Sequence, residues 1–448
     1  MKLANYSDQA VQYCEKLGAD EAEAYVQTVQ TIEVVLERAE IQNERVKKMQ
    51  GIGIRAIKDK KLGFAFTSSV DKGKMQEACR SALSLASVSL PNQDWVSLPE
   101  PQKLPKSPMG IFDKKAADAG AEEVISLVTR AYDEAKAYDE RVEIDDGKFS
   151  VFTYQAAVSN SHGVEAEGKK TLLVGSLVCV AREGGETSSA ASEYDVSTSL
   201  KDFSPERVGR LAAEKAVASL KPKAVASFDG KCILDPTVAS AVLVQPIISS
   251  INADNVQKSR SLWSNRLGQE VAVANLTLID DGLLSKGIGS SSFDSEGVPC
   301  QKTLVIESGT LLNFLYDSFS AHKENKKSTG NGHRAAYSQL PSITVSNLII
   351  KAGTKRLDEL ISEVDKGILV KRFSGNVRQE SGEFSGIAKQ ASYIEGGEIK
   401  HCLKETMISG NAFQAIKYII EIGSEIRPTQ NQTYVPPMLV DKMTIVSK

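Results

Sequence analysis

The sequence predicts an α+β protein, in which an N-terminal α/β domain with a mixed sheet precedes a larger, β-rich C-terminal domain with a few helices. Two patterns predict this class. In the N-terminal half, segments with apolar residues at helical spacing alternate with segments in which apolar residues recur at every second position. From residue 223 onward, short strand patterns separated by Gly and Ser turns predominate. The length of 448 residues exceeds what one hydrophobic core usually holds, so two or three domains are expected.

The N-terminal α/β segment comprises residues 1–90. Its predicted helices cover residues 7–16 and 72–86, and its predicted strands cover residues 21–29, 32–38, 51–57 and 61–67. A short polar turn, Lys58 to Lys60, separates the last two strands, which are therefore expected to form a hairpin. Asp71 directly precedes the second helix, where its carboxylate can cap free N–H groups.

A linker, a middle segment and the C-terminal domain follow. Residues 91–112 contain five prolines, which fix φ and remove backbone donors, so we interpret this stretch as a Pro-rich linker. The middle α/β segment, residues 113–222, is predicted to contain helices at 117–137 and 204–219 and strands at 142–154, 163–182 and 186–199. The C-terminal domain, residues 223–448, is predicted to be mainly strands around a helix at 237–251.

The composition favours a soluble cytoplasmic protein. There are 54 Lys and Arg against 57 Asp and Glu, a net charge of −3, so no global attraction to nucleic acid is expected. No apolar run is long enough to cross a membrane, and the first residues lack the apolar stretch of a secretory signal. The six cysteines stand singly without a CxxC pair, which is typical of reduced thiols. We expect neither membrane association nor direct binding of nucleic acid.

The histidines exclude a helical zinc motif. A HExxH or HExxxH motif places two imidazoles and a glutamate on one helix. The chain has four histidines, and the closest two, His322 and His333, are separated by the turn signal 328–332. A site assembled from His322, His333, His401 and Cys402 remains open on sequence grounds. No GxxxxGK[ST] loop is present, so a phosphate-binding loop of that type is not expected.

Two polar segments are candidates for binding a peptide. Residues 318–334 join a short helical pattern to Gly330, Asn331 and Gly332, which favour positive φ and could form a nest of backbone donors. Residues 372–386 alternate polar and small side chains, as an edge strand beside a cleft would. An exposed edge can bind an extended peptide through main-chain hydrogen bonds. For both segments, ordinary loop or packing duty is the alternative interpretation.

Six segments resemble the TldD/PmbA family, also called the modulator of DNA gyrase family, and they occur in the family's order along essentially the whole chain. They are GIGIRAIKDKKLGFAFT (51–67), FDSEGVP (293–299), GTLLNFLYDSFSAHK (309–323), KSTG (327–330), ASYIEGGEIK (391–400) and TMISGN (406–411). The resemblance implies a two-subunit cytoplasmic protease that acts on peptides or unfolded segments. One subunit, TldD, carries HExxxH and a C-terminal cysteine as zinc ligands, and the other, TldE or PmbA, lacks them.

This chain departs from the TldD pattern at both places where ligands are expected. The predicted helix continues through residues 242–251 without a histidine or an acid, and residues 423–437 contain no cysteine. It therefore resembles the TldE/PmbA-type subunit, although residues 328–334 are closer to the TldD form of that loop. The resemblance places Gln245 and Ser249 at the degenerate metal position.

The resemblance predicts a non-catalytic subunit that binds no cofactor itself, with zinc expected on a TldD-like partner. The partner is either that subunit, in a heterodimer, or a second copy of this chain. An independent metallopeptidase-like hydrolase and a homodimeric peptide-binding protein are the alternatives. No catalytic or metal-binding residue is assigned to this chain. The candidate peptide-binding or cavity residues are Ser328, Thr329, Asn331, His333, Arg334, Arg378, Ser381 and Ser385.

Overall fold

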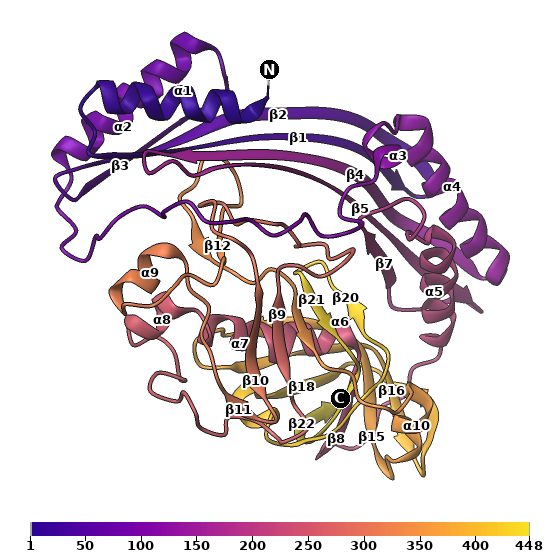
Figure 1. The fold of residues 1–448 in the computed structure, drawn as a ribbon. Helices are drawn as coiled ribbons and strands as arrows, with labels where there is room; N and C mark the ends of the chain where they lie inside the picture. Colours follow the sequence, from indigo (N-terminus) through magenta and orange to yellow (C-terminus); the bar gives the residue numbers. More distant parts are fainter. Residues whose placement is uncertain (1, 448) are drawn as a thin grey trace.

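The computed structural model describes residues 2–447 and shows a long, curved N-terminal sheet arching over a C-terminal domain (Figure 1). The strand order of this sheet is β3-β2-β1-β4-β5-β6, with β7 also beside β5. Its strands are β1 (Glu21–Glu37), β2 (Glu40–Lys58), β3 (Lys61–Thr67), β4 (Val142–Asn160), β5 (Glu165–Glu183), β6 (Glu186–Thr187) and β7 (Ala191–Ser197). The residues 1–90 and 113–222 thus contribute to one sheet, because β1 pairs with β4 along most of its length.

Every strand pair in this sheet is antiparallel. The mixed sheet predicted for the N-terminal domain is therefore not found there. Hairpins join β1 to β2, β2 to β3 and β4 to β5, and such direct connections require antiparallel neighbours. The parallel pairs lie in the C-terminal domain, whose sheets are mixed.

Five helices accompany the N-terminal sheet, and the four longer ones cover its convex face at the two ends (Figure 1). They are α1 (Leu3–Lys16), α2 (Lys72–Val88), α3 (Lys114–Ala117), α4 (Ala121–Tyr138) and α5 (Pro205–Ala218). One apolar core lies beneath α1 and α2, and a second lies beneath α4 and α5. Asp71 caps α2 as predicted, accepting the N–H of Gly73 at 2.9 Å.

The proline-rich residues 91–112 run along the concave face of the sheet, between it and the C-terminal domain (Figure 1). Side chains of the sheet fix this segment. Glu21 accepts hydrogen bonds from Trp95 Nε1 at 2.6 Å and from the N–H of Leu98 at 2.8 Å. Asn160 donates to the carbonyl of Pro99 at 2.8 Å. The segment therefore forms part of the interface between the two halves of the molecule.

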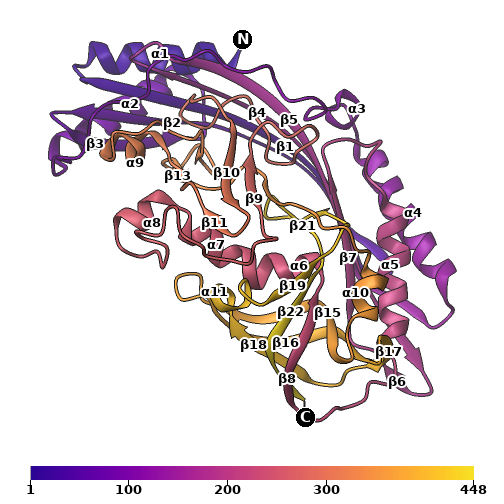
Figure 2. The same ribbon diagram turned by 60° about the horizontal axis from the view of Figure 1, so that its bottom comes forward.

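The C-terminal domain is built on a five-stranded ring of order β15-β8-β22-β18-β16, which the pairing of β15 with β16 closes (Figure 2). Two further strands, β17 and β19, extend it. These strands are β8 (Phe228–Leu234), β15 (Lys366–Val377), β16 (Glu383–Glu395), β17 (Glu398–Cys402), β18 (Thr406–Asn411), β19 (Ile419–Ile422) and β22 (Met438–Ser447). The β15–β8 pair is parallel, which makes this sheet mixed.

A second, smaller sheet of order β11-β10-β9-β14-β21-β20 lies toward the N-terminal sheet. Its strands are β9 (Leu278–Asp281), β10 (Lys302–Glu307), β11 (Thr310–Leu311), β14 (Leu348–Ile350), β20 (Arg427–Pro428) and β21 (Thr433–Val435), and a separate pair is formed by β12 (Gly332–His333) and β13 (Ser342–Ile343). The predicted α+β class, with a β-rich C-terminal domain, is confirmed.

The helix predicted at 237–251 occurs as three consecutive pieces, the middle one a π-helical turn. These are α6 (Pro236–Ala239), η1 (Ser240–Val244) and α7 (Gln245–Ser250). The other helices of the domain are α8 (Ala253–Gln257), α9 (Ser318–Lys323), α10 (Leu357–Ser362) and α11 (Ala412–Ala415). The apolar side of α6–η1–α7 belongs to the largest core of the protein. Across residues 2–447, no helix has the length and apolar character that crossing a membrane requires.

The contact between α4 and α5 provides a test of the fold. A Cβ at Gly209 would lie 1.9 Å from the carbonyl oxygen of Ala131. Helix propensity alone predicts that Gly209→Ala stabilises the protein by about 1 kcal/mol. We expect the clash to reverse the sign and to lower the free energy of unfolding by about 1–2 kcal/mol. Denaturant unfolding measures this difference.

The control is Gly120→Ala, because a Cβ at Gly120 meets no atom within 4 Å. Gly120 is the N-cap of α4, where Ala is less favourable than Gly, so we expect the control to lower the free energy of unfolding by about 0.5–1 kcal/mol and no more. A Gly209→Ala protein as stable as the wild type would contradict the close packing of α4 on α5.

Candidate functional site

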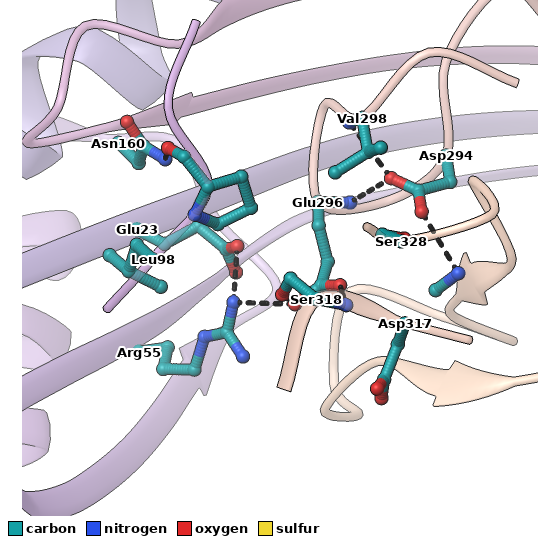
Figure 3. Close-up of polar contacts among 12 residues, drawn as sticks. Glu23, Arg55, Leu98, Asn160, Asp294, Glu296, Val298, Asp317, Ser318 and Ser328 are labelled. Atoms are coloured by element: carbon teal, nitrogen blue, oxygen red, sulfur yellow. Dashed lines mark hydrogen bonds and ion pairs between the residues drawn. The ribbon is translucent and has the colours of Figure 1, made fainter. Parts of the chain in front are cut away.

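A cluster of four buried charged side chains joins the N-terminal sheet to the C-terminal domain, and Figure 3 shows three of them, Glu23, Arg55 and Glu296. Arg55 on β2 donates from Nη2 to Glu23 Oε2 on β1 at 2.6 Å and to Glu296 Oε1 at 3.1 Å. Arg334, which follows β12, pairs with the other oxygen of Glu23. None of the four side chains is more than 7% exposed. We call these residues the interdomain ion cluster.

Glu296 reaches the cluster from a tight turn of the C-terminal domain. Asp294 Oδ1 accepts the N–H groups of Glu296 at 2.9 Å and Val298 at 3.0 Å (Figure 3). Gly297 has a φ of +80°, which glycine adopts without the strain that a side chain would bring. Glu296 also accepts hydrogen bonds from Ser318, at 2.6 Å from Oγ and 2.9 Å from the backbone N–H. The carboxylate therefore has fixed donors from both domains.

The electrostatics of the cluster keep Glu296 ionised. Burial alone would raise the pKa of Glu296, but the charge of Arg55 and the hydrogen bonds from Ser318 lower it below its usual range. Burial would likewise lower the pKa of Arg55, and the two carboxylates raise it instead. Asp294 behaves oppositely, since burial and the nearby charge of Glu296 raise its pKa well above the usual value. The carboxylates of Glu23 and Glu296 thus balance the two guanidinium groups of the cluster inside the interface.

A cavity of about 520 Å³ opens beside this cluster, between the concave face of the sheet and the loops of the C-terminal domain. The sheet contributes Tyr25, Phe152, Tyr154 and Lys170, among others. The C-terminal domain contributes the serine-rich run 288–295, residues 333–335, and Gln430 and Gln432. This volume lies within the range typical of small-molecule sites, about 300–1,000 Å³.

His333 and Arg334, both predicted as cavity residues, line this cavity. The imidazole Nε2 of His333 lies 3.2 Å from Ser346 Oγ. Burial and the nearby charge of Lys170 lower the pKa of His333 to about 4, so the ring is neutral at pH 7. Arg334 packs over the ring of Tyr25, with 5.2 Å between its guanidinium carbon and the ring centroid. One side of the cavity therefore depends on the ion cluster for its position.

Three other predicted residues, Ser328, Thr329 and Asn331, do not line the cavity. Their side chains instead hold the loop of residues 328–334 in place. Ser328 Oγ donates to the carbonyl of Tyr316 at 3.1 Å, and Thr329 Oγ1 accepts the N–H of Tyr316 at 2.7 Å. Asn331 Nδ2 donates to Asp280 Oδ2 at 2.7 Å, and burial raises the pKa of Asp280 to about 6. Gly330 has a positive φ, but the N–H groups of Gly330 and Gly332 already donate to Ser328 Oγ at 3.2 Å and Asp294 Oδ2 at 2.9 Å, so these two donors of the expected nest are not available to a peptide.

The structure places Arg378, Ser381 and Ser385 at the tip of the β15–β16 hairpin, away from the cavity-lining residues. Arg378 pairs with Glu383 at 3.2 Å, and Ser385 is exposed. The turn packs on α11 through Phe413, and α11 in turn contacts α7. The hairpin tip is thus connected to the helix of Gln245, while its hydrogen bonds do not reach residues 328–334.

Gln245 and Ser249 both lie on α7, but this helix offers zinc no suitable donors. Ser249 Oγ accepts a hydrogen bond from Asn255 at 3.2 Å, and Gln245 is an amide. Zinc sites use imidazole, thiolate and carboxylate ligands. Within residues 2–447, His, Cys, Asp and Glu side chains form no group of three suited to a metal ion, so His322, His333, His401 and Cys402 are not brought together. The residues present at α7 do not fit a zinc ion.

Comparison with known sequences identifies the family. The PmbA/TldA metallopeptidase profiles match the chain in three consecutive parts: domain 1 at residues 22–86, the central domain at 114–220 and the C-terminal domain at 229–447. The chain belongs to the PmbA/TldD metallopeptidase family. An uncharacterized protein of Methanocaldococcus jannaschii is 30% identical over 89% of each chain. A metalloprotease TldD homolog of Buchnera aphidicola is 27% identical, over 88% of this chain and 83% of that protein.

A solved structure supports the same assignment to the PmbA/TldD family. The crystal structure of TldE from Thermococcus kodakarensis superimposes with a TM-score of 0.93 and 25% sequence identity. The match covers 98% of this chain and 100% of that one. The arrangement of both domains in this PmbA/TldD protein is therefore shared with TldE along the full length.

The ion cluster and Lys170 were not predicted from the sequence. Arg55 stands inside an otherwise apolar strand pattern, which is a signal of a buried partner, whereas Glu23 alternates with alanines as Glu21 does, which is typical of an exposed position. Glu296 belongs to the run FDSEGVP, which resembles the family but carries no sign of a buried ion pair. The two pairs that cross between the halves, Arg55 with Glu296 and Arg334 with Glu23, are 241 and 311 residues apart in sequence, so this pairing required the structure.

Removal of one charge tests whether the interdomain ion cluster stabilises the folded protein. Glu23→Gln leaves Arg55 and Arg334 without a shared counterion, and breaking a buried ion pair in this way typically costs about 3–5 kcal/mol. We expect that loss in the free energy of unfolding, measured by denaturant titration. The matched control is Glu33→Gln on the same strand, whose carboxylate pairs with Lys148 near the surface. This control should lose less than about 1 kcal/mol, and equal losses for both variants would contradict the role of the cluster.

The pKa of His333 predicts a pH dependence. Its folded-state pKa of about 4 lies below the ordinary 6.5, so the unfolded chain binds a proton first as the pH falls. The neutral ring therefore contributes stability above pH 6.5, and this contribution is lost toward pH 4. Between pH 7.5 and 5 we expect wild type to lose about 2 kcal/mol more than His333→Gln does, in paired denaturant titrations. Parallel pH profiles for the two proteins would show that His333 is not held neutral.

Proposed function

We propose that this chain is a non-catalytic, TldE/PmbA-type subunit of a two-subunit cytoplasmic metalloprotease. In this proposal a TldD-type partner carries the catalytic zinc and cleaves peptides or unfolded segments. This chain completes the chamber in which those substrates are held. Modulation of DNA gyrase, the activity after which the family is also named, would then be an indirect consequence of proteolysis.

One observation carries the proposal. The helix α6–η1–α7, where the family resemblance places the zinc motif, contains no histidine, cysteine, aspartate or glutamate over residues 236–250. The same chain matches TldE of Thermococcus kodakarensis along its full length. A family member that keeps the whole fold but lacks metal ligands at this helix is suited to support a catalytic subunit.

The geometry of the cavity supports binding of a short peptide segment. Its walls combine aromatic rings, serine hydroxyls and the side-chain amides of Gln430 and Gln432. Apolar walls with a few polar groups are typical of sites that bind small molecules or chain ends. The proposal assigns no proton transfer to this chain, because the neutral His333 faces Ser346 and Lys170 rather than a nucleophile or a metal ligand set.

Reconstitution tests the proposal. We expect the purified chain alone to cleave no peptide and to contain no stoichiometric zinc, and addition of its TldD-type partner to produce zinc-dependent cleavage of a quenched fluorescent peptide. Gln245→Ala and Ser249→Ala in this chain should leave that cleavage rate unchanged, whereas substitution of a zinc ligand in the partner should abolish it.

Two outcomes would contradict the proposal. Cleavage by the chain alone, with stoichiometric zinc, would make it an independent hydrolase. A stable homodimer that binds peptides and forms no complex with the partner on co-expression would make it a separate peptide-binding protein. Size-exclusion chromatography with light scattering distinguishes the second case.

A further inference from the structure

A lysine without a counterion stands in the wall of the interdomain cavity. Lys170 lies on β5 and lines the cavity. Within residues 2–447 its ammonium group makes no ion pair and no hydrogen bond, and Nζ lies 5.5 Å from the centroid of the Tyr154 ring. Burial lowers the pKa of Lys170, the nearby Cys300 opposes this change only in part, and no carboxylate opposes it. The folded chain thus supplies no counterion for the protonated ammonium group of Lys170.

No other charged group that lines the cavity is available as a counterion for Lys170. Asp294 is the one acidic residue in the lining, and both of its oxygens already accept backbone N–H groups, from Glu296, Val298 and Gly332. Arg334 adds positive charge, but Glu23 neutralises it. Lys169 stacks its ammonium 4.0 Å from the centroid of Phe112. The cavity therefore has an excess of positive charge centred on Lys170.

We propose that this cavity binds the carboxylate of a peptide, with Lys170 as the ion-pair partner of that carboxylate. Ser291 and Ser292 of the C-terminal domain line the same cavity and can donate hydrogen bonds to the carboxylate, while Phe152 and Tyr154 contact the apolar part of the ligand. The inference rests on the proposed function only in taking the ligand to be a peptide. A carboxylate in this position would restore the charge balance that the folded chain lacks.

The volume limits what can bind. A cavity of about 520 Å³ holds a short chain end and excludes a folded domain. A peptide presents a carboxylate either at its C-terminus or on an Asp or Glu side chain. Both sources offer the same group to Lys170, and the experiment separates them.

The test measures binding of three unlabelled, N-acetylated pentapeptides to the full chain by isothermal titration calorimetry, without any partner protein. The first peptide is uncharged except for a free C-terminal carboxylate, the second is its C-terminal amide, and the third is the amide with one internal aspartate. We expect the first peptide, the third or both to bind, and the second to bind at least about tenfold more weakly. Binding of the first peptide would show that the carboxylate comes from the C-terminus, and binding of the third would show that it comes from a side chain.

Substitutions of Lys170 test whether this residue binds the peptide carboxylate. Lys170→Met should weaken binding of the carboxylate peptide at least about tenfold, while Lys170→Arg should retain most of it. The matched control is Lys148→Met on the neighbouring strand β4, which removes the same charge from a residue that pairs with Glu33 outside the cavity. That control should bind as the wild type does.

Thermal unfolding separates binding from folding. Because Lys170 is a half-buried cation without a counterion, Lys170→Met should unfold at an equal or higher temperature than the wild type in the absence of peptide. Equal binding of the acid and the amide, loss of binding in the Lys148 control, or no binding of any peptide would overturn the inference. These binding measurements are independent of the cleavage assay, so each proposal can fail without the other.

Discussion

The ion pairs of Glu23 with Arg55 and Arg334, and of Arg55 with Glu296, hold the two halves of this protein in register. They connect two strands of the N-terminal sheet to two loops of the C-terminal domain that are far apart in sequence. A buried charge without its partner is costly, so these groups fix both the separation and the orientation of the sheet and the domain. The cavity lies directly beside them, and Arg334 and Asp294 contribute to the junction and to the cavity wall. The geometry of the candidate site therefore depends on this junction.

The sequence predicts local elements well where apolar residues repeat with a clear period. The hairpin of β2 and β3, the cap at Asp71 and helices α4 and α5 follow from alternation, helical spacing and capping residues. Residues 40–50 of β2 escaped prediction because nearly all of them are exposed, so the strand carries no alternation of buried and exposed positions. The antiparallel N-terminal sheet was also missed, since strand direction depends on pairings between distant segments.

The sequence likewise predicts only part of the candidate site. Polar and glycine residues cluster around His333 and Arg334, which predicts a binding segment, and both residues line the cavity. A similar pattern predicts the same for Arg378, Ser381 and Ser385, yet they lie at a hairpin tip whose contacts run toward α11. The sequence gives no signal for Lys170, because a lysine in a strand, here next to Lys169, is usually exposed. Its unpaired state becomes visible only when the lining of the cavity is known.

The account divides the chemistry between two chains, with binding surface on this one and zinc on its partner. The metal content of the co-purified complex tests this division most directly. Inductively coupled plasma mass spectrometry on a complex with one copy of each chain should find one zinc per pair, and zinc should be absent from this chain once the two are separated. Two zinc ions per pair, or zinc that remains with this chain after separation, would contradict the account.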